Sequence, residues 1–227
     1  MFKFSFDWLK EYLGTDIKFK EILKMLNLQG FEFQGEQKVG NDTVMAIEVK
    51  DNRPDMLSHM GIAREKKAFC GEKIPKPQRA DIKINSDSFP IKIRVSDPKA
   101  CRRFSGIIIK NINNTVSTPE YIKRRLEALG INLVNAIVDI TNYVMLDMGQ
   151  PMHSYDIDKL SGKEINVDKA QKESKIITLG NNEAVLKSGD IIISDNENIL
   201  CVAGIIGAQN ANVTEKSSNV LLEGAVF

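Results

Sequence analysis

The chain has 227 residues, a net charge of +1 and 42% hydrophobic residues, which suits one large domain or a small domain plus a medium one and argues against a disordered chain. So small a net charge gives no overall attraction to DNA or to a membrane, and any RNA contact must come from a local patch. Cys70, Cys101 and Cys201 are far apart and form no CxxC pair, which indicates a reduced, cytoplasmic protein without disulfides or a zinc site. No run approaches about 18 apolar residues, so no membrane span is expected.

Residues 1–77 predict a small domain of helices and strands. The expected helices cover residues 6–13 (capped by Ser5), 19–27 and 56–69, and the expected strands cover 31–34 and 44–49. Its expected core gathers apolar residues of the first two helices: Trp8, Leu9, Ile22 and Leu26. The following stretch KIPKPQRAD places two prolines among polar residues and predicts a linker.

Residues 78–227 predict a larger, β-rich domain. Strand patterns occur in FPIKIRVS, in FSGIIIKNI and in five short segments after residue 153. One helix is expected to begin at Thr118-Pro119-Glu120 and to end at Gly130, with Lys123, Arg124 and Arg125 on its outer surface. Because strands and helices do not alternate as βαβ units, the predicted class is α+β: a small helical and strand domain followed by a larger β-rich α+β domain.

One polar segment, DITNYVMLDMGQPMHSYDIDKL, contains one of the two histidines of the chain, His153, after a Gly-Gln-Pro turn. With Asn142 upstream, it suggests the rim of a pocket in which both side chains position a substrate or a water molecule. A structural histidine with Asn142 in a turn explains the same residues. His59 lies in a predicted helix without an evident partner and is interpreted as structural.

Two further segments allow either a site or an ordinary structural role. Glu223 lies in the apolar strand LLEGAVF, where a carboxylate is either exposed at a sheet edge or faces a cavity. Ala203, Gly204 and Gly207 lie in CVAGIIGA, where small residues either let a ligand approach the backbone or form a tight turn. No Ser-His-Asp order or paired-carboxylate motif indicates a standard catalytic set, and no HExxH motif indicates a metal site.

Several segments, taken in chain order, resemble the N-terminal half of the β subunit of bacterial phenylalanyl-tRNA synthetases. They are FSFDWLKEYLG, LNLQGFEFQG, EVKDNRPDMLSHMGIAREKKAF, CRRFSGIIIKNI, TNYVMLDMGQPMHSYDIDKL and LCVAGIIGAQNANVTEKSSNVLLEGAVF. The resemblance covers nearly the whole chain, and TNYVML with GQPMH is its most specific part. It implies an editing domain that removes tyrosine mischarged onto the phenylalanine tRNA.

The resemblance also implies roles for single residues. By motif, Asn142 and His153 would be catalytic, while the substrate would contact Pro151, Ala203, Gly204, Gly207 and Glu223. Glu223 would accept a hydrogen bond from the tyrosine phenol, which phenylalanine cannot donate. The implied partners are the aminoacylated 3′ end of tRNA and the synthetase α subunit. No cofactor is implied in this chain, since ATP and Mg²⁺ would serve the aminoacylation site on the α subunit.

The chain departs from the family pattern in three ways. A short loop replaces the tRNA-binding OB-fold usually inserted in the first domain; GIIGAQN, with Ala208 and Asn210, replaces GIMGG and a serine; and the sequence ends at Phe227. An added methyl group at Ala208 would narrow the pocket. Two alternatives to an editing β subunit therefore stay open: a non-catalytic, architectural or tRNA-contacting domain, and a freestanding hydrolase that acts on mischarged tRNA.

Overall fold

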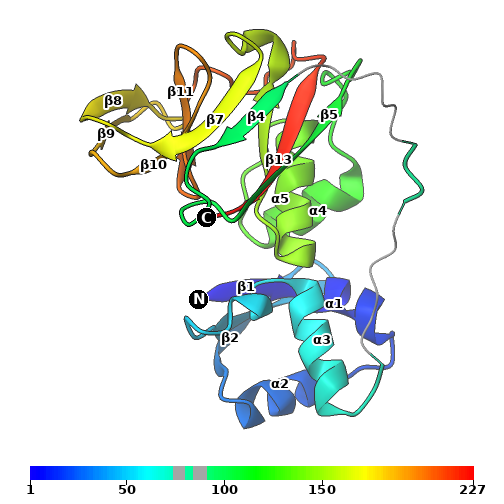
Figure 1. The fold of residues 1–227 in the computed structure, drawn as a ribbon. Coiled ribbons are helices and arrows are strands. Elements are labelled where there is room, and N and C mark those ends of the chain that lie inside the picture. Colours follow the sequence, from blue (N-terminus) through cyan, green and yellow to red (C-terminus); the bar gives the residue numbers. More distant parts are fainter. Residues whose placement is uncertain (74–79, 84–90) are drawn as a thin grey trace. The chain divides into compact units, whose positions relative to one another are not determined.

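The computed structural model describes residues 1–73, 80–83 and 91–227, which form two compact units (Figure 1). The first unit comprises Met1–Ile82, Thr118–Val134 and Asp139–Pro151, and the second comprises Lys83–Ser117, Asn135–Val138 and Met152–Phe227. Both units combine helices or turns with β-sheet, and the predicted α+β class is confirmed. Most of the predicted linker, and the predicted boundary at residue 77, lie outside the described residues.

The two compact units do not coincide with a single cut at residue 77. The segments Thr118–Val134 and Asp139–Pro151, expected in the larger domain, group with the N-terminal residues. The reason is an apolar cluster in which Trp8 and Val44 pack with Ile122, Leu126 and Leu146. The chain thus leaves the first unit after residue 82 and returns to it twice.

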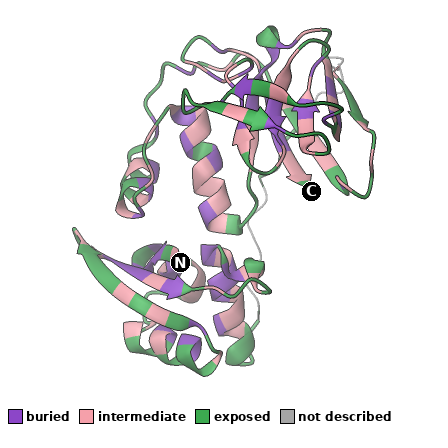
Figure 2. Cartoon of the chain, turned by 90° about the vertical axis from the view of Figure 1, so that its left-hand side faces the viewer, coloured by how far each residue is buried: buried purple, intermediate pink, exposed green. Residues whose placement is uncertain are grey.

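In its described residues, the first unit contains a three-stranded antiparallel sheet and five α-helices. The strands, in spatial order, are β1 (Phe2–Ser5), β3 (Asp42–Glu48) and β2 (Glu32–Val39). The helices are α1 (Phe6–Leu13), α2 (Phe19–Leu28), α3 (His59–Phe69), α4 (Glu120–Ala128) and α5 (Ala136–Met148), whose first turn belongs to the second unit; a short 3₁₀ helix covers Pro54–Met56. Strand β2 has no buried residue and alternates half-buried and exposed positions along most of its length (Figure 2).

Local signals account for the start of α1 and for the turn before α3. The Ser5 hydroxyl accepts the Trp8 N–H at 2.9 Å, the expected cap of the first helix. Arg53, in the DNRPD turn, bonds both Asp55 (3.0 Å) and Glu65 (2.7 Å), which ties the turn to α3. The 56–69 region is a 3₁₀ turn and then α3, which begins with Ser58 accepting the Gly61 N–H.

The N-terminal core forms as expected around Leu9, Ile22 and Leu26, but Trp8 does not belong to it. Trp8 is 1% exposed and packs instead in the cluster with α4 and α5, stacked on Tyr143 with ring centroids 4.5 Å apart. Arg125 was expected on the outer surface of its helix. Its guanidinium lies over the Trp8 ring, 4.8 Å from the centroid, because the indole face attracts a cation.

His59 is fully buried in the first unit and has both ring nitrogens bonded. Nε2 accepts the Ser5 N–H at 3.0 Å, and Nδ1 donates to the Leu146 carbonyl at 2.8 Å. These partners require the neutral tautomer with its proton on Nδ1. Burial, the dominant cause, lowers the pKa of His59 to about 3. The structural interpretation of this residue is confirmed.

The second unit is built from β-sheets, and its described residues form a main apolar cluster, which includes Tyr155 and Ile165, and a smaller one around Ile176 and Leu186. A five-stranded sheet has the order β12 (Ile206–Gly207), β11 (Ile199–Val202), β10 (Ile191–Ser194), β7 (Glu164–Lys169) and β4 (Lys92–Val95). A three-stranded sheet has the order β5 (Arg103–Ile109), β13 (Val220–Val226) and β6 (His153–Asp156), and β8 (Ser174–Ile177) pairs with β9 (Glu183–Leu186). The β4–β7 pair is parallel and the other pairs are antiparallel.

Strands β1 and β6 and helix α5 were not predicted from the sequence. Helix α5 contains Ile137, Val138, Ile140, Thr141 and Val144, whose β-branched side chains disfavour a helix. Two signals could have found it: Asn135, whose Oδ1 accepts the Val138 N–H, and Gly149, which has φ +83° directly after the last helical residue. In the described part of the chain, no helix is both long and apolar enough to cross a membrane.

Candidate functional site

The structure brings His153 and Glu223 together in the second unit, although 69 positions separate them in the sequence. They are direct cross-strand partners in the antiparallel pair of β6 and β13, and so lie on one face of the sheet. Strand β13 lies between β5 and β6, so Glu223 is not on an edge strand; it is only 5% exposed. The exposed-edge alternative for Glu223 is therefore wrong.

Two further polar groups surround the Glu223 carboxylate. The Tyr155 hydroxyl donates to Glu223 Oε2 at 2.5 Å, and the Cys201 thiol lies close enough for the carboxylate to act on it electrostatically. Burial raises the pKa of Glu223, and the bond from Tyr155 opposes that shift. Burial and then the Glu223 charge raise the pKa of Cys201 to about 12, so this thiol is protonated at neutral pH. His153, Tyr155, Cys201, Gly207 and Glu223 are called the β6–β13 cluster below.

Gly207 lets the His153 ring lie against β12. A Cβ atom at position 207 would be 2.6 Å from His153 Cε1 and 2.9 Å from Leu179 Cδ1. Any side chain there would have to move the imidazole. Burial lowers the pKa of His153, which keeps the ring neutral at neutral pH and able to accept a proton or orient water.

Gly207→Ala is expected to displace the His153 ring and to destabilise the fold by about 2 kcal/mol through overpacking. Gly180→Ala is the matched control, because its Cβ would come no closer than 3.4 Å to Asn182 Nδ2. Imidazole resonances and urea unfolding measure the two effects. Unchanged His153 resonances in Gly207→Ala would contradict the contact.

The remaining residues of CVAGIIGA have ordinary structural environments. Gly204 is exposed at the turn between β11 and β12 with φ +69°, a conformation that itself favours glycine. Ala203 is half-buried beside the core, and its N–H donates to the Ile191 carbonyl. Ala208 is buried with Ile176, Leu186 and Val202, where its methyl group has apolar neighbours. Contacts of Ala203 and Gly204 with a substrate stay predictions.

Asn142 and Pro151 belong to the first unit, whereas the β6–β13 cluster belongs to the second. Asn142 is half-buried on α5 and Pro151 is exposed, with its carbonyl accepting the side-chain amide of Gln150 at 2.8 Å. Their participation in one site with His153 stays a prediction.

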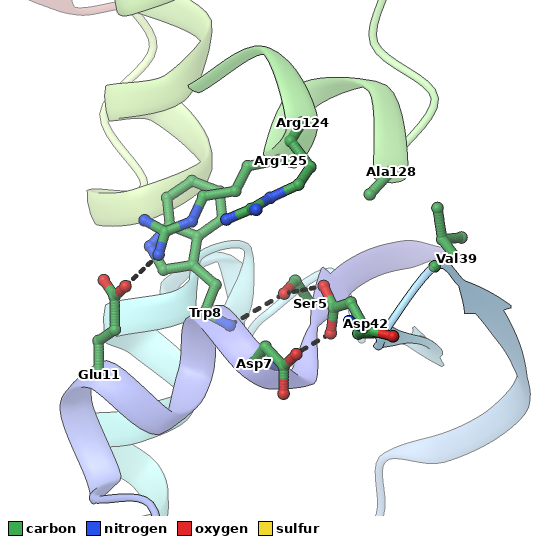
Figure 3. Close-up of a pocket in the computed structure, with 11 residues that line it drawn as sticks. Ser5, Asp7, Trp8, Glu11, Val39, Asp42, Arg124, Arg125 and Ala128 are labelled. Carbon is green, nitrogen blue, oxygen red and sulfur yellow. Dashed lines mark hydrogen bonds and ion pairs between the residues drawn. The ribbon is translucent and has the colours of Figure 1, made fainter. Parts of the chain in front are cut away.

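A separate cavity of about 560 Å³ lies within the first unit and contains none of the predicted site residues (Figure 3). It is lined by residues of α1, of the β2–β3 turn region and of α4: Ser5, Asp7, Trp8, Glu11, Val39, Gly40, Asn41, Asp42, Arg124, Arg125 and Ala128. Figure 3 shows Arg124 and Arg125 reaching from α4 toward Trp8.

Most of the charged side chains that line this cavity already have an ion-pair or hydrogen-bond partner. Arg125 forms an ion pair with Glu11, Asp7 pairs with Lys10 at 2.6 Å, and Asp42 accepts the Ser5 hydroxyl at 2.5 Å. Because both carboxylates and guanidinium groups line the cavity, it favours neither an anionic nor a cationic ligand. The β6–β13 cluster, with its buried carboxylate beside a neutral imidazole, is the better candidate for chemistry.

Sequence reasoning missed Tyr155 and Cys201. Tyr155 is two residues after His153, so the period of a strand puts both on one face once β6 is recognised. Cys201 comes from a different sheet, and no sequence signal pointed to it. Within the described residues, no group of three or more His, Cys, Asp or Glu side chains is arranged to hold a metal ion.

Comparisons with known proteins agree on one family. The model of the B3/4 domain matches residues 100–227. The phenylalanine–tRNA ligase beta subunit of Fusobacterium nucleatum is 40% identical over 188 residues, covering 82% of this chain and 23% of that protein. The subunit of the same name from Rhodopirellula baltica is 31% identical over 225 residues, covering 98% of this chain and 33% of the relative.

The fold also matches a solved structure. An N-terminal fragment of the phenylalanyl-tRNA synthetase beta subunit from Pyrococcus horikoshii aligns with a TM-score of 0.52 at 19% identity, covering 99% of this chain and 67% of the fragment. This likeness concerns the fold alone. The chain spans about a quarter to a third of the length of the two curated relatives described above.

Proposed function

Because this chain belongs to the B3/4 domain family, we propose that it is the proofreading part of a phenylalanyl-tRNA synthetase β subunit and hydrolyses tyrosine mischarged onto the phenylalanine tRNA. The observation that carries the proposal is the buried Glu223 carboxylate directly opposite His153 on β6 and β13. The pair offers an acceptor for a phenol beside a neutral base.

Glu223 supplies the selection in this proposal. A carboxylate accepts on both oxygens, and Tyr155 uses Oε2, so Oε1 is assigned to the phenol of the substrate. A phenylalanyl ester would cover the carboxylate without donating a bond, which costs roughly 1–3 kcal/mol. A site that hydrogen-bonds the hydroxyl discriminates far better than an apolar pocket, which only weakly rejects an added hydroxyl.

His153 supplies the chemistry. Its neutral imidazole holds a water molecule near the ester carbonyl and accepts a proton as the water attacks. The ester C–O bond then breaks, and the imidazolium returns the proton to the ribose oxygen that leaves. An aminoacyl ester is already activated, so correct positioning provides much of the rate. The reaction needs no cofactor in this chain; ATP and Mg²⁺ would serve aminoacylation on the α subunit.

The proposed partners follow from this substrate. The site would receive the aminoacylated 3′ end of tRNA in the cytoplasm, and the α subunit would complete the enzyme. Ala203, Gly204 and Gly207 are proposed to shape the walls around the amino acid. A freestanding hydrolase would bind the same ester without the α subunit.

The rate of tyrosyl ester hydrolysis is expected to stay constant as the pH falls to 6.5, the ordinary pKa of histidine, and to decline only below it. Burial lowers the pKa of His153, so the neutral base persists at mildly acidic pH. The phenylalanyl ester has no hydroxyl to bond Glu223, so the pH dependence of its hydrolysis reflects the titration of His153 alone. An acid limb centred at or above pH 6.5 for both esters would contradict the assignment.

The proposed function is tested by deacylation of phenylalanine tRNA charged with tyrosine or with phenylalanine. The full-length subunit, assayed with its α subunit, is expected to hydrolyse the tyrosyl ester faster. Each rate is compared with the spontaneous hydrolysis of the same ester in buffer. Equal rates for the two esters, or no rate above spontaneous hydrolysis, would overturn the proposal.

One observation favours an architectural role as the second candidate. The Tyr155 bond already satisfies one oxygen of Glu223, and such buried pairs also serve to fix a core. If the role is architectural, neither ester would be hydrolysed above background by the wild type or by Glu223→Ala. The substitution would lower only the stability of the fold.

A further inference from the structure

We propose that Tyr155 is a positioning residue for Glu223: its phenol holds one oxygen of the carboxylate and presents the other oxygen, as an ionised acceptor, to the phenol of a tyrosyl ester. The identity of that ester rests on the proposed function. The coupling between Tyr155 and Glu223 does not, and it is tested separately below.

The strand register creates this contact. Glu223 pairs with His153 and Leu221 pairs with Tyr155, so Tyr155 and Glu223 are diagonal neighbours on the same sheet face. The hydroxyl reaches Oε2 at 2.5 Å, the short distance of a bond to a charged acceptor. The ring of Tyr155 also meets the His153 ring edge-on, with centroids 4.7 Å apart. One tyrosine therefore touches both groups of the proposed reaction.

Tyr155 is held too firmly to act as a displaceable gate. It is 1% exposed and belongs to the main core of the second unit, with Ile165, Ile193 and Leu221 among its cluster. A rotation away from Glu223 would open that core. A ligand phenol must therefore approach the oxygen that Tyr155 leaves available, and the fixed bond defines where that oxygen lies.

The surroundings make Tyr155 the group that opposes neutralisation of the carboxylate. Burial favours the protonated form of Glu223, and the Tyr155 bond is the opposing influence. Among the residues that the structure describes, the other titratable groups that face Glu223 are His153 on β6, Cys201 on β11 and Cys101 before β5. Burial lowers the pKa of His153 and raises the pKa of both thiols, so all three are neutral at neutral pH.

The direct test is a titration of the Glu223 carboxyl carbon by ¹³C NMR in the whole 227-residue chain, with the resonance assigned by its loss in Glu223→Gln. In Tyr155→Phe the midpoint is expected to move to higher pH, because the hydrogen bond to the charged form is gone. Tyr121→Phe, at an exposed position on α4, is the matched control and is expected to leave the midpoint unchanged. A midpoint unchanged in Tyr155→Phe would overturn the inference.

A second measurement avoids any loss of folding in Tyr155→Phe. Replacement of the tyrosines by a fluorotyrosine keeps the shape of the side chain and makes the phenol a stronger donor. The Glu223 midpoint is then expected to move to lower pH. A shift in the opposite direction, or none, would contradict a donating Tyr155.

The effect on activity is measured with the complete two-subunit enzyme and with phenylalanine tRNA charged with either tyrosine or phenylalanine. Tyr155→Phe is expected to lower the preference for the tyrosyl ester about tenfold, mainly through KM, while hydrolysis of the phenylalanyl ester changes little. If the wild-type enzyme shows the preference and the variant keeps it, the positioning role is wrong. If the wild type shows no preference, the proposed function fails, whereas the titration still decides the coupling of Tyr155 to Glu223.

Discussion

Acidification from about pH 7.5 to about pH 4.5 is expected to remove about 3 kcal/mol of unfolding free energy through His59 alone. The ordinary pKa of 6.5 applies in the unfolded chain, whereas burial lowers the pKa to about 3 in the fold. Between these values the unfolded chain binds a proton that the native protein does not. The stabilisation is therefore present above pH 6.5 and is lost as the pH falls toward 3.

The structure explains why His59 cannot accept this proton in place. Protonated Nε2 would face the Ser5 N–H, which already donates to it at 3.0 Å, and two donors would oppose each other. The slope of unfolding free energy against pH, measured by urea denaturation, is expected to flatten in His59→Gln. His153→Gln removes the other histidine and should keep most of the slope. A slope equally steep in His59→Gln would show that the acid sensitivity lies elsewhere.

His153→Ala is expected to slow tyrosyl ester hydrolysis about 100-fold, the usual loss when a positioned general base is removed. The side chain is only half-buried, so the fold should persist. Single-turnover deacylation by the complete enzyme measures the rate.

Two further observations separate a chemical role of His153 from a structural one. Added imidazole is expected to restore part of the rate in His153→Ala, because the deletion leaves space beside Gly207. His153→Phe fills the same space and should not respond to imidazole. A variant as fast as the wild type would remove His153 from the mechanism.

Much of the fold could be predicted where local chemistry decides it. The cap at Ser5, the helix over Phe6–Leu13 and the short strands after residue 153 follow from nearby residues and from period-two patterns. For helix α5, only the ends carry local signals, at Asn135 and Gly149. Tertiary packing of Leu146 and Tyr143 against Trp8 overrides the poor helix propensity of the β-branched residues between them.

The candidate site shows the same limit. Glu223 could be recognised as unusual inside an apolar strand, but whether that strand lies at the edge or in the centre depends on its pairing with β5 and β6. Both partners are remote in sequence. The Tyr155 bond depends on a strand register that a single sequence does not specify. The packing of Trp8 with α4 likewise depends on the chain's return to the first unit.

Selection of the phenol by Glu223 is measured by the ratio of kcat/KM values for tyrosyl and phenylalanyl esters, compared between the wild type and Glu223→Ala in the complete enzyme. The wild type is expected to favour the tyrosyl ester, and Glu223→Ala is expected to lower that ratio about tenfold or more by slowing only the tyrosyl reaction. An unchanged ratio, or an equal loss for both esters, would contradict selection of the phenol by Glu223.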